Sequence, residues 1–131
     1  MDHWSTKYLG KPWKEDYDCY AFFLEVQKKE FGLKEQLDFV PPNYSNRKKA
    51  IEFVENSEDV KTHWKDICIP TEGDAVLFGA SNHSFHIGIW VNIDGESGVI
   101  HCQIGHGVVF TSRRNIIERG VKIASYLRCK K

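Results

Sequence analysis

The fold of this chain is decided by residues 86–103, which read HIGIWVNIDGESGVIHCQ. Apolar and β-branched residues fill both halves of this stretch. Asp94-Gly95 between the halves is a residue pair typical of a two-residue hairpin turn. Such a turn pairs Ile93 with Glu96 and thereby fixes the register of the whole hairpin. We therefore predict two antiparallel strands, at about 86–91 and 99–104.

Two histidines meet on one face of this predicted hairpin. Alternate residues of a strand share a face, and the register places His86 opposite Gln103 and His101 opposite Gly88. The two imidazoles then become diagonal neighbours within side-chain reach. Gly88 has no side chain, which leaves room for His101 to lean toward His86. Cys102 points to the opposite face.

The rest of the chain divides into a helical half and a strand half. Further strands are expected at 75–78, 108–110 and 121–127. Residues 33–46 are expected to form an extended loop, about 47–56 a second helix, and 57–72 an unassigned segment that Trp64, Ile67 and Ile69 anchor. Helices followed by strands predict an α+β fold with an antiparallel sheet. The length of 131 residues suits one domain, 1–131.

The clearest helix begins after Asp18, which is a good N-cap residue. Cys19, Phe22, Phe23 and Val26 follow helical spacing, and Gly32 is the natural stop. Cys19 is therefore expected in the first turn of a helix. Unpaired backbone N–H groups and the helix dipole favour thiolate over thiol at that position.

Composition excludes several classes of function. Lys+Arg and Asp+Glu both number 18, so the zero net charge gives no support for a nucleic-acid partner. No apolar run has the length of a signal peptide or a membrane span, so we expect a soluble, cytoplasmic product without membrane insertion. The four cysteines form no C-x-x-C pair and are expected to be reduced. Because His83-x-x-His86 has no second paired motif, neither a metal nor another cofactor is expected.

These residues together suggest a cysteine hydrolase. A cysteine nucleophile requires a base, and the base requires a group that fixes its tautomer. We assign Cys19 as nucleophile, His86 as base and His101 as orienting residue, while Gln103 shares their face and could contribute to the orientation. The backbone N–H of Cys19 is a candidate oxyanion donor. The other three cysteines are interpreted as small buried hydrophobes: Cys68, Cys102 and Cys129.

The chain resembles the NlpC/P60 family of cell-wall cysteine peptidases. The matching motifs occur in the family's order and cover most of residues 8–110; they are 8–13 (YLGKPW), 18–19 (DC), 73–78 (GDAVLF), 86–91 (HIGIWV) and 99–101 (VIH). Residues 107–110 and 126–128 resemble the compact members found in phage tails. The resemblance implies a papain-like fold, with the cysteine-bearing helix packed on an antiparallel sheet.

The resemblance also implies a substrate and a place of action. The family cleaves stem peptides of peptidoglycan, commonly between D-glutamate and a diamino acid, which makes the stem peptide the expected partner. A phage or prophage tail component would reach the cell wall within the particle, beside other tail proteins. Two alternatives stay open: a related thiol amidase or acyltransferase on the same fold, and a catalytically inactive tail module.

One departure from the family concerns the oxyanion site. Family members often place a tyrosine at the position of Trp13, which has no hydroxyl. Tyr17 or Tyr8 is the candidate to supply the missing hydroxyl. Trp13 itself is a candidate to line a substrate groove, because it neighbours the proposed site.

Overall fold

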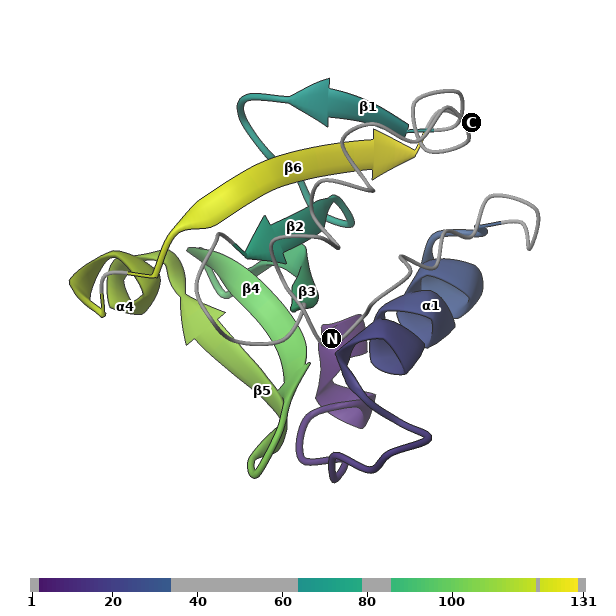
Figure 1. Ribbon diagram of the computed structural model, residues 1–131. Coiled ribbons are helices and arrows are strands. Elements are labelled where there is room, and N and C mark those ends of the chain that lie inside the picture. The colour runs from purple at the N-terminus through teal and green to yellow at the C-terminus, as the bar shows by residue number, and fades with distance from the viewer. Residues whose placement is uncertain (1–2, 34–63, 79–85, 120, 130–131) are drawn as a thin grey trace.

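The structure is a computed structural model that describes residues 3–33, 64–78, 86–119 and 121–129. The N-terminal part contains a 3₁₀ helix, η1 (Trp4–Lys7), and the helix α1 (Cys19–Glu30). From residue 64 on, the described residues contain strands and a short helix: β1 (Trp64–Ile67), β2 (Ala75–Phe78), β3 (Ile87–Ile93), β4 (Glu96–Gln103), β5 (Gly107–Ser112), α4 (Arg113–Glu118) and β6 (Ile123–Cys129). This is an α+β architecture, as predicted (Figure 1).

The six strands form one antiparallel sheet in the order β1-β6-β2-β3-β4-β5. The last strand, β6, lies between β1 and β2, which places the C-terminal strand inside the sheet. Between β3 and β4, Ile93 pairs with Glu96 and Ile89 with Ile100. The hairpin turn has positive φ at both Asp94 (53°) and Gly95 (84°), as this type of two-residue turn requires. The predicted hairpin and its register are confirmed.

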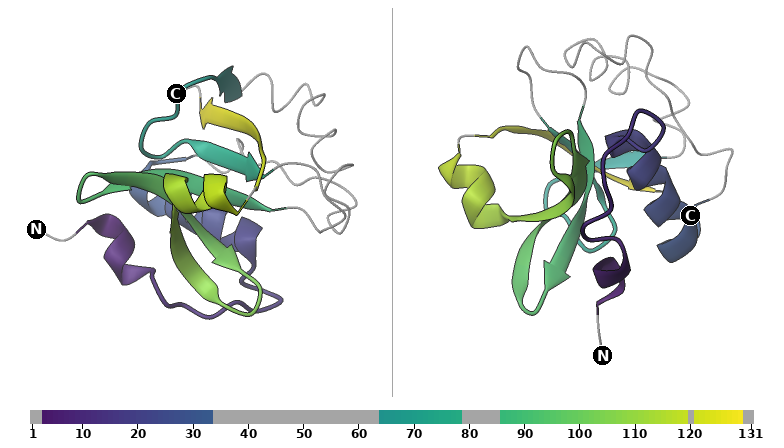
Figure 2. Two further views of the ribbon diagram at one scale, coloured as in Figure 1. Left: turned by 90° about the vertical axis from the view of Figure 1, so that its left-hand side faces the viewer. Right: turned by 90° about the horizontal axis from the view of Figure 1, so that it is seen from below.

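The two helices α1 and α4 cover opposite faces of the sheet (Figure 2). We call the core on the first face the α1-face cluster; its buried members are Tyr8, Cys19, Tyr20, Phe22, Phe23, Val26, Leu33, Trp64, Ala75, Leu77, Ile87, Ile89, Val91, Ile100, Cys102, Val108 and Leu127. The smaller α4-face cluster consists of Val76, Phe78, Trp90, Val99 and Ile116. Residues of the same strand alternate between the two clusters, as the two-residue period of a strand requires.

Several sequence predictions need correction. Residues 64–67, left unassigned, form the edge strand β1, and α4 was not expected. Trp64 is buried, but Ile69 is 81% exposed and anchors nothing. The expected helix at about 47–56, and all but the first residue of the expected loop at 33–46, lie outside the described residues. None of the described helices is long and apolar enough to cross a membrane.

Candidate active site

The first turn of α1 holds Cys19 in place. The Asp18 carboxylate accepts hydrogen bonds from the backbone N–H groups of Tyr20 (3.1 Å) and Ala21 (2.9 Å), which confirms the predicted N-cap. Cys19 is therefore the first residue of the helix, as expected. Its side chain is 5% exposed and belongs to the α1-face cluster.

A second thiol, Cys102, lies close to this helix start. Its Sγ–H donates to the backbone carbonyl of Tyr17 at 3.6 Å. Burial raises the pKa of Cys102 to about 11, and the nearby Cys19 and Asp18 contribute to this rise because they can carry negative charge. Cys102 is therefore a neutral, fully buried thiol, as predicted. The same prediction is wrong for Cys68, which is exposed, and for Cys129, which is only half-buried; all four cysteines are free of disulfides.

His86 and His101 form the hydrogen-bonded pair that the hairpin register predicts. Nε2 of His86 lies 2.6 Å from Nδ1 of His101. Nε2 of His101 in turn lies 2.9 Å from Oγ1 of Thr111, which belongs to the edge strand β5. These contacts join side chains of three consecutive segments into one chain of hydrogen bonds.

Phe78 holds the pair from the side of β2. Its ring centroid lies 4.8 Å from that of His86 and 5.4 Å from that of His101. Its backbone N–H also donates to the carbonyl of His86 at 3.2 Å, so the same residue fixes both the backbone and the ring of His86. Sequence reasoning missed Phe78 and Thr111.

Gly88 provides the space that was predicted for His101. A Cβ atom at position 88 would lie 3.0 Å from Cβ of His101 and 2.4 Å from Cγ1 of Val99. Any side chain there would displace one of these neighbours. The close approach of β3 and β4 at the histidine pair therefore depends on glycine.

His101 is neutral near pH 7. Burial, together with the positive charge of Arg119, lowers its pKa to about 4. A neutral imidazole carries one N–H and one lone pair, so His101 can donate to only one of its two partners.

Cys19 and the histidine pair lie at the same end of the hairpin but on different faces of the sheet. The thiol packs in the α1-face cluster, beside Cys102 near the end of β4. His86 and His101 pack against Phe78, which belongs to the α4-face cluster. His86 precedes β3 directly, at the edge where the strand begins. The structure thus brings the predicted base and the predicted orienting residue together and places the predicted nucleophile, Cys19, in the α1-face cluster.

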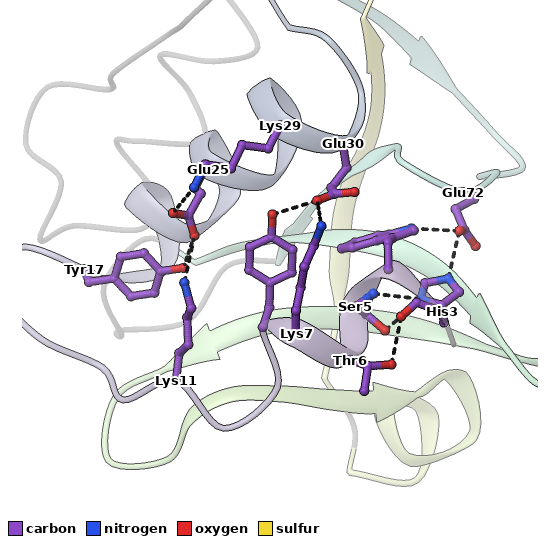
Figure 3. Close-up of polar contacts among 12 residues, drawn as sticks. His3, Ser5, Thr6, Lys7, Lys11, Tyr17, Glu25, Lys29, Glu30 and Glu72 are labelled. Atoms are coloured by element: carbon purple, nitrogen blue, oxygen red, sulfur yellow. Dashed lines mark hydrogen bonds and ion pairs between the residues drawn. The ribbon is translucent and has the colours of Figure 1, made fainter. Parts of the chain in front are cut away.

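Of the two tyrosines proposed for the oxyanion site, Tyr17 binds a glutamate of α1 in Figure 3, and Tyr8 likewise binds a glutamate of this helix. Tyr17 donates to Glu25 at 2.6 Å, and Tyr8 donates to Glu30 at 2.8 Å. Burial, together with these hydrogen bonds, raises the pKa of both phenols well above the usual range. The two hydroxyls thereby join the N-terminal segment to α1, and each donates its hydrogen to a carboxylate.

The two remaining candidates from the sequence are Trp13 and Gln103. Trp13 is half-buried and packs against the α1-face cluster. Gln103 is half-buried at the end of β4, and its carbonyl accepts the N–H of His106 in the turn to β5. Among the described residues, no three His, Cys, Asp or Glu side chains are grouped to hold a metal ion; His83 lies outside them.

Comparison with known proteins identifies no family for this chain. No protein-family model matches it, and no curated protein sequence matches it. The resemblance to NlpC/P60 peptidases therefore depends on the motifs and on their order along the chain.

Proposed function

We propose that this protein is a cysteine hydrolase of papain-like NlpC/P60 type that cleaves an amide bond in peptidoglycan stem peptides. The bond would lie between D-glutamate and a diamino acid, and the enzyme would act as a phage or prophage tail component. The observation that carries the proposal is the 2.6 Å contact between Nε2 of His86 and Nδ1 of His101. A base held by a second imidazole is what a cysteine nucleophile requires.

The proposed reaction has two steps. The Cys19 thiolate attacks the carbonyl carbon, the C–N bond breaks, and the leaving amine takes a proton from the His86 imidazolium. Water then attacks the thioester carbonyl while His86 takes its proton, and the Cys19 sulfur leaves as thiolate. The start of α1 offers the backbone N–H of Cys19 to the oxyanion formed in each step.

A second candidate is a catalytically inactive tail module. Cys19 belongs to the α1-face cluster, whereas the histidine pair packs against Phe78 of the α4-face cluster. The hydrolase requires thiol and imidazole within hydrogen-bond reach of each other, and a tail module has no such requirement.

Digestion of purified peptidoglycan and defined muropeptides, with products weighed by mass spectrometry, distinguishes the two functions. Cys19→Ser should reduce turnover on the order of 10³-fold or more, because the nucleophile acts as a unit with its base. Cys102→Ser is the matched control, since it changes a neighbouring buried thiol, and it should leave turnover within a few-fold of wild type.

Two results would overturn the catalytic function. Equal digestion by wild type and Cys19→Ser would mean that the Cys19 thiol is not the nucleophile. Muropeptides left intact by a folded wild-type protein would favour the tail module.

A further inference from the structure

The histidine pair continues into a third side chain that the proposed mechanism does not use. Thr111 lies on the edge strand β5, opposite Val99 of β4 and diagonal to His101. Its Oγ1 is 2.9 Å from Nε2 of His101. His101 is 5% exposed, so the polar atoms of its ring depend on protein partners.

Two directions of hydrogen bonding are compatible with these distances. In the first, His86 donates from Nε2 to Nδ1 of His101, and His101 donates from Nε2 to Thr111. In the second, every donor is reversed, so that Thr111 donates to His101 and His101 donates to His86. Each histidine then holds its hydrogen on Nε2 in the first direction and on Nδ1 in the second.

Physical chemistry favours the first direction. The Nε2–H form is the more stable tautomer of a free neutral histidine side chain, and the first direction gives both residues this form. Thr111 is half-buried, so its hydroxyl can accept from His101 and donate its own hydrogen outward. Arg119 opposes a positive charge on His101, which helps to keep this ring neutral.

We propose that Thr111 is a positioning residue that fixes the tautomer of the pair by accepting the Nε2–H of His101. The role of Thr111 in catalysis rests on the proposed function. With Nδ1 of His101 left as an acceptor, His86 donates from Nε2 and keeps a lone pair on Nδ1. Nδ1 of His86 is then the atom that takes the proton from the nucleophile.

The test reads the tautomer directly and needs no activity. Histidine labelled with ¹⁵N, in the full chain near pH 7, distinguishes a protonated ring nitrogen from one with a lone pair in a long-range ¹H–¹⁵N spectrum. His101→Gln assigns the signals. Wild type and Thr111→Ser should both show Nε2–H at His101, because serine keeps the hydroxyl.

Thr111→Val keeps the shape and the β-branching but removes the acceptor. A buried N–H without an acceptor is unfavourable, so His101 should switch to Nδ1–H and donate to His86. His86 then loses its lone pair on Nδ1, and kcat on muropeptides should fall at least about tenfold, with Thr111→Ser restoring it. Circular dichroism establishes that each variant is folded.

Each outcome separates this inference from the proposed function. Nδ1–H at His101 in the wild type, or an unchanged tautomer in Thr111→Val, overturns the role of Thr111 whatever the activity. The expected tautomers combined with full digestion by Cys19→Ser support Thr111 and overturn the catalytic function alone.

Discussion

At the scale of the residue, His101 shows how burial determines chemistry. The ring is enclosed by β2, β4 and β5, and His86 and Thr111 accept or donate at its two nitrogens. Burial and the charge of Arg119 keep it neutral at a pH where an exposed histidine is partly charged. A neutral ring can have a fixed tautomer, whereas an imidazolium has two donors and no acceptor.

The same burial predicts a pH dependence of stability. The pKa of His101 falls from 6.5 to about 4 on folding, so between these values the unfolded chain binds a proton that the native state does not. The free energy of unfolding should therefore decrease as the pH falls from about 6.5 to 4, by at most about 3 kcal/mol. Urea denaturation of wild type and His101→Gln at several pH values measures this contribution.

The contribution of His101 is the difference between the two proteins. His101→Gln cannot titrate, so its stability should fall less steeply over this window. Parallel curves for the two proteins would contradict the lowered pKa. Three carboxylates with lowered pKa values, Glu25, Glu30 and Glu72, also stabilise the fold, and this stabilisation is lost below about pH 4.5. They are present in both proteins, so they do not affect the difference between the two curves.

At the scale of the element, the β3–β4 hairpin carries the part of the site that the sequence predicts best. Its register follows from the Asp94-Gly95 turn alone, and register decides which side chains share a face. The contact of Thr111 with His101 depends on a second turn, at residues 104–106, whose length the sequence leaves open. That is why the histidine pair is predictable and its third member is not.

Within this hairpin, Gly88 is expected to be intolerant of substitution. A Cβ at position 88 would lie 2.4 Å from Cγ1 of Val99, so Gly88→Ala should lower the free energy of unfolding by about 1–3 kcal/mol. Val99→Ala removes that closest atom. The double variant should therefore lose less stability than the two single variants together, as urea denaturation can measure. Additive losses would mean that the crowding at Val99 is not the cause.

At the scale of the whole molecule, the sequence predicts every strand of the described sheet except β1, but it does not predict which elements cover the two faces. Strand parity correctly places His86 and His101 together and Cys102 opposite them. It contains no information about which face α1 covers, because that depends on the long-range packing of Phe22, Phe23 and Val26. The order of the strands cannot be predicted from the sequence for the same reason. β6 lies between β1 and β2, so it pairs with residues that are far away along the chain.

Besides the backbone pairing of β6 with β1 and β2, the side chain of Asp74 joins the turn before β2 to β6. Its buried carboxylate accepts the backbone N–H of Thr71 at 2.6 Å and two hydrogen bonds from Arg128, at 2.9 and 2.8 Å. Asp74→Ala leaves the Thr71 N–H without this acceptor and should lower the free energy of unfolding by about 2 kcal/mol. Asp74→Asn keeps an acceptor for Thr71 and should lose less.

The control for this prediction is Asp66→Ala, which removes an exposed carboxylate from the edge strand β1. Removal of charge alone should change the urea midpoint little, because an exposed carboxylate contributes little to stability. A loss at Asp66 equal to the loss at Asp74 would mean that net charge, and not the contact with Thr71 and Arg128, is responsible. If instead Asp74→Ala alone is destabilising, the buried carboxylate stabilises the contact between β6 and the segment before β2. It does so together with the direct hydrogen bond from Arg128 to Oγ1 of Thr71 at 3.0 Å and the backbone pairing of β2 with β6.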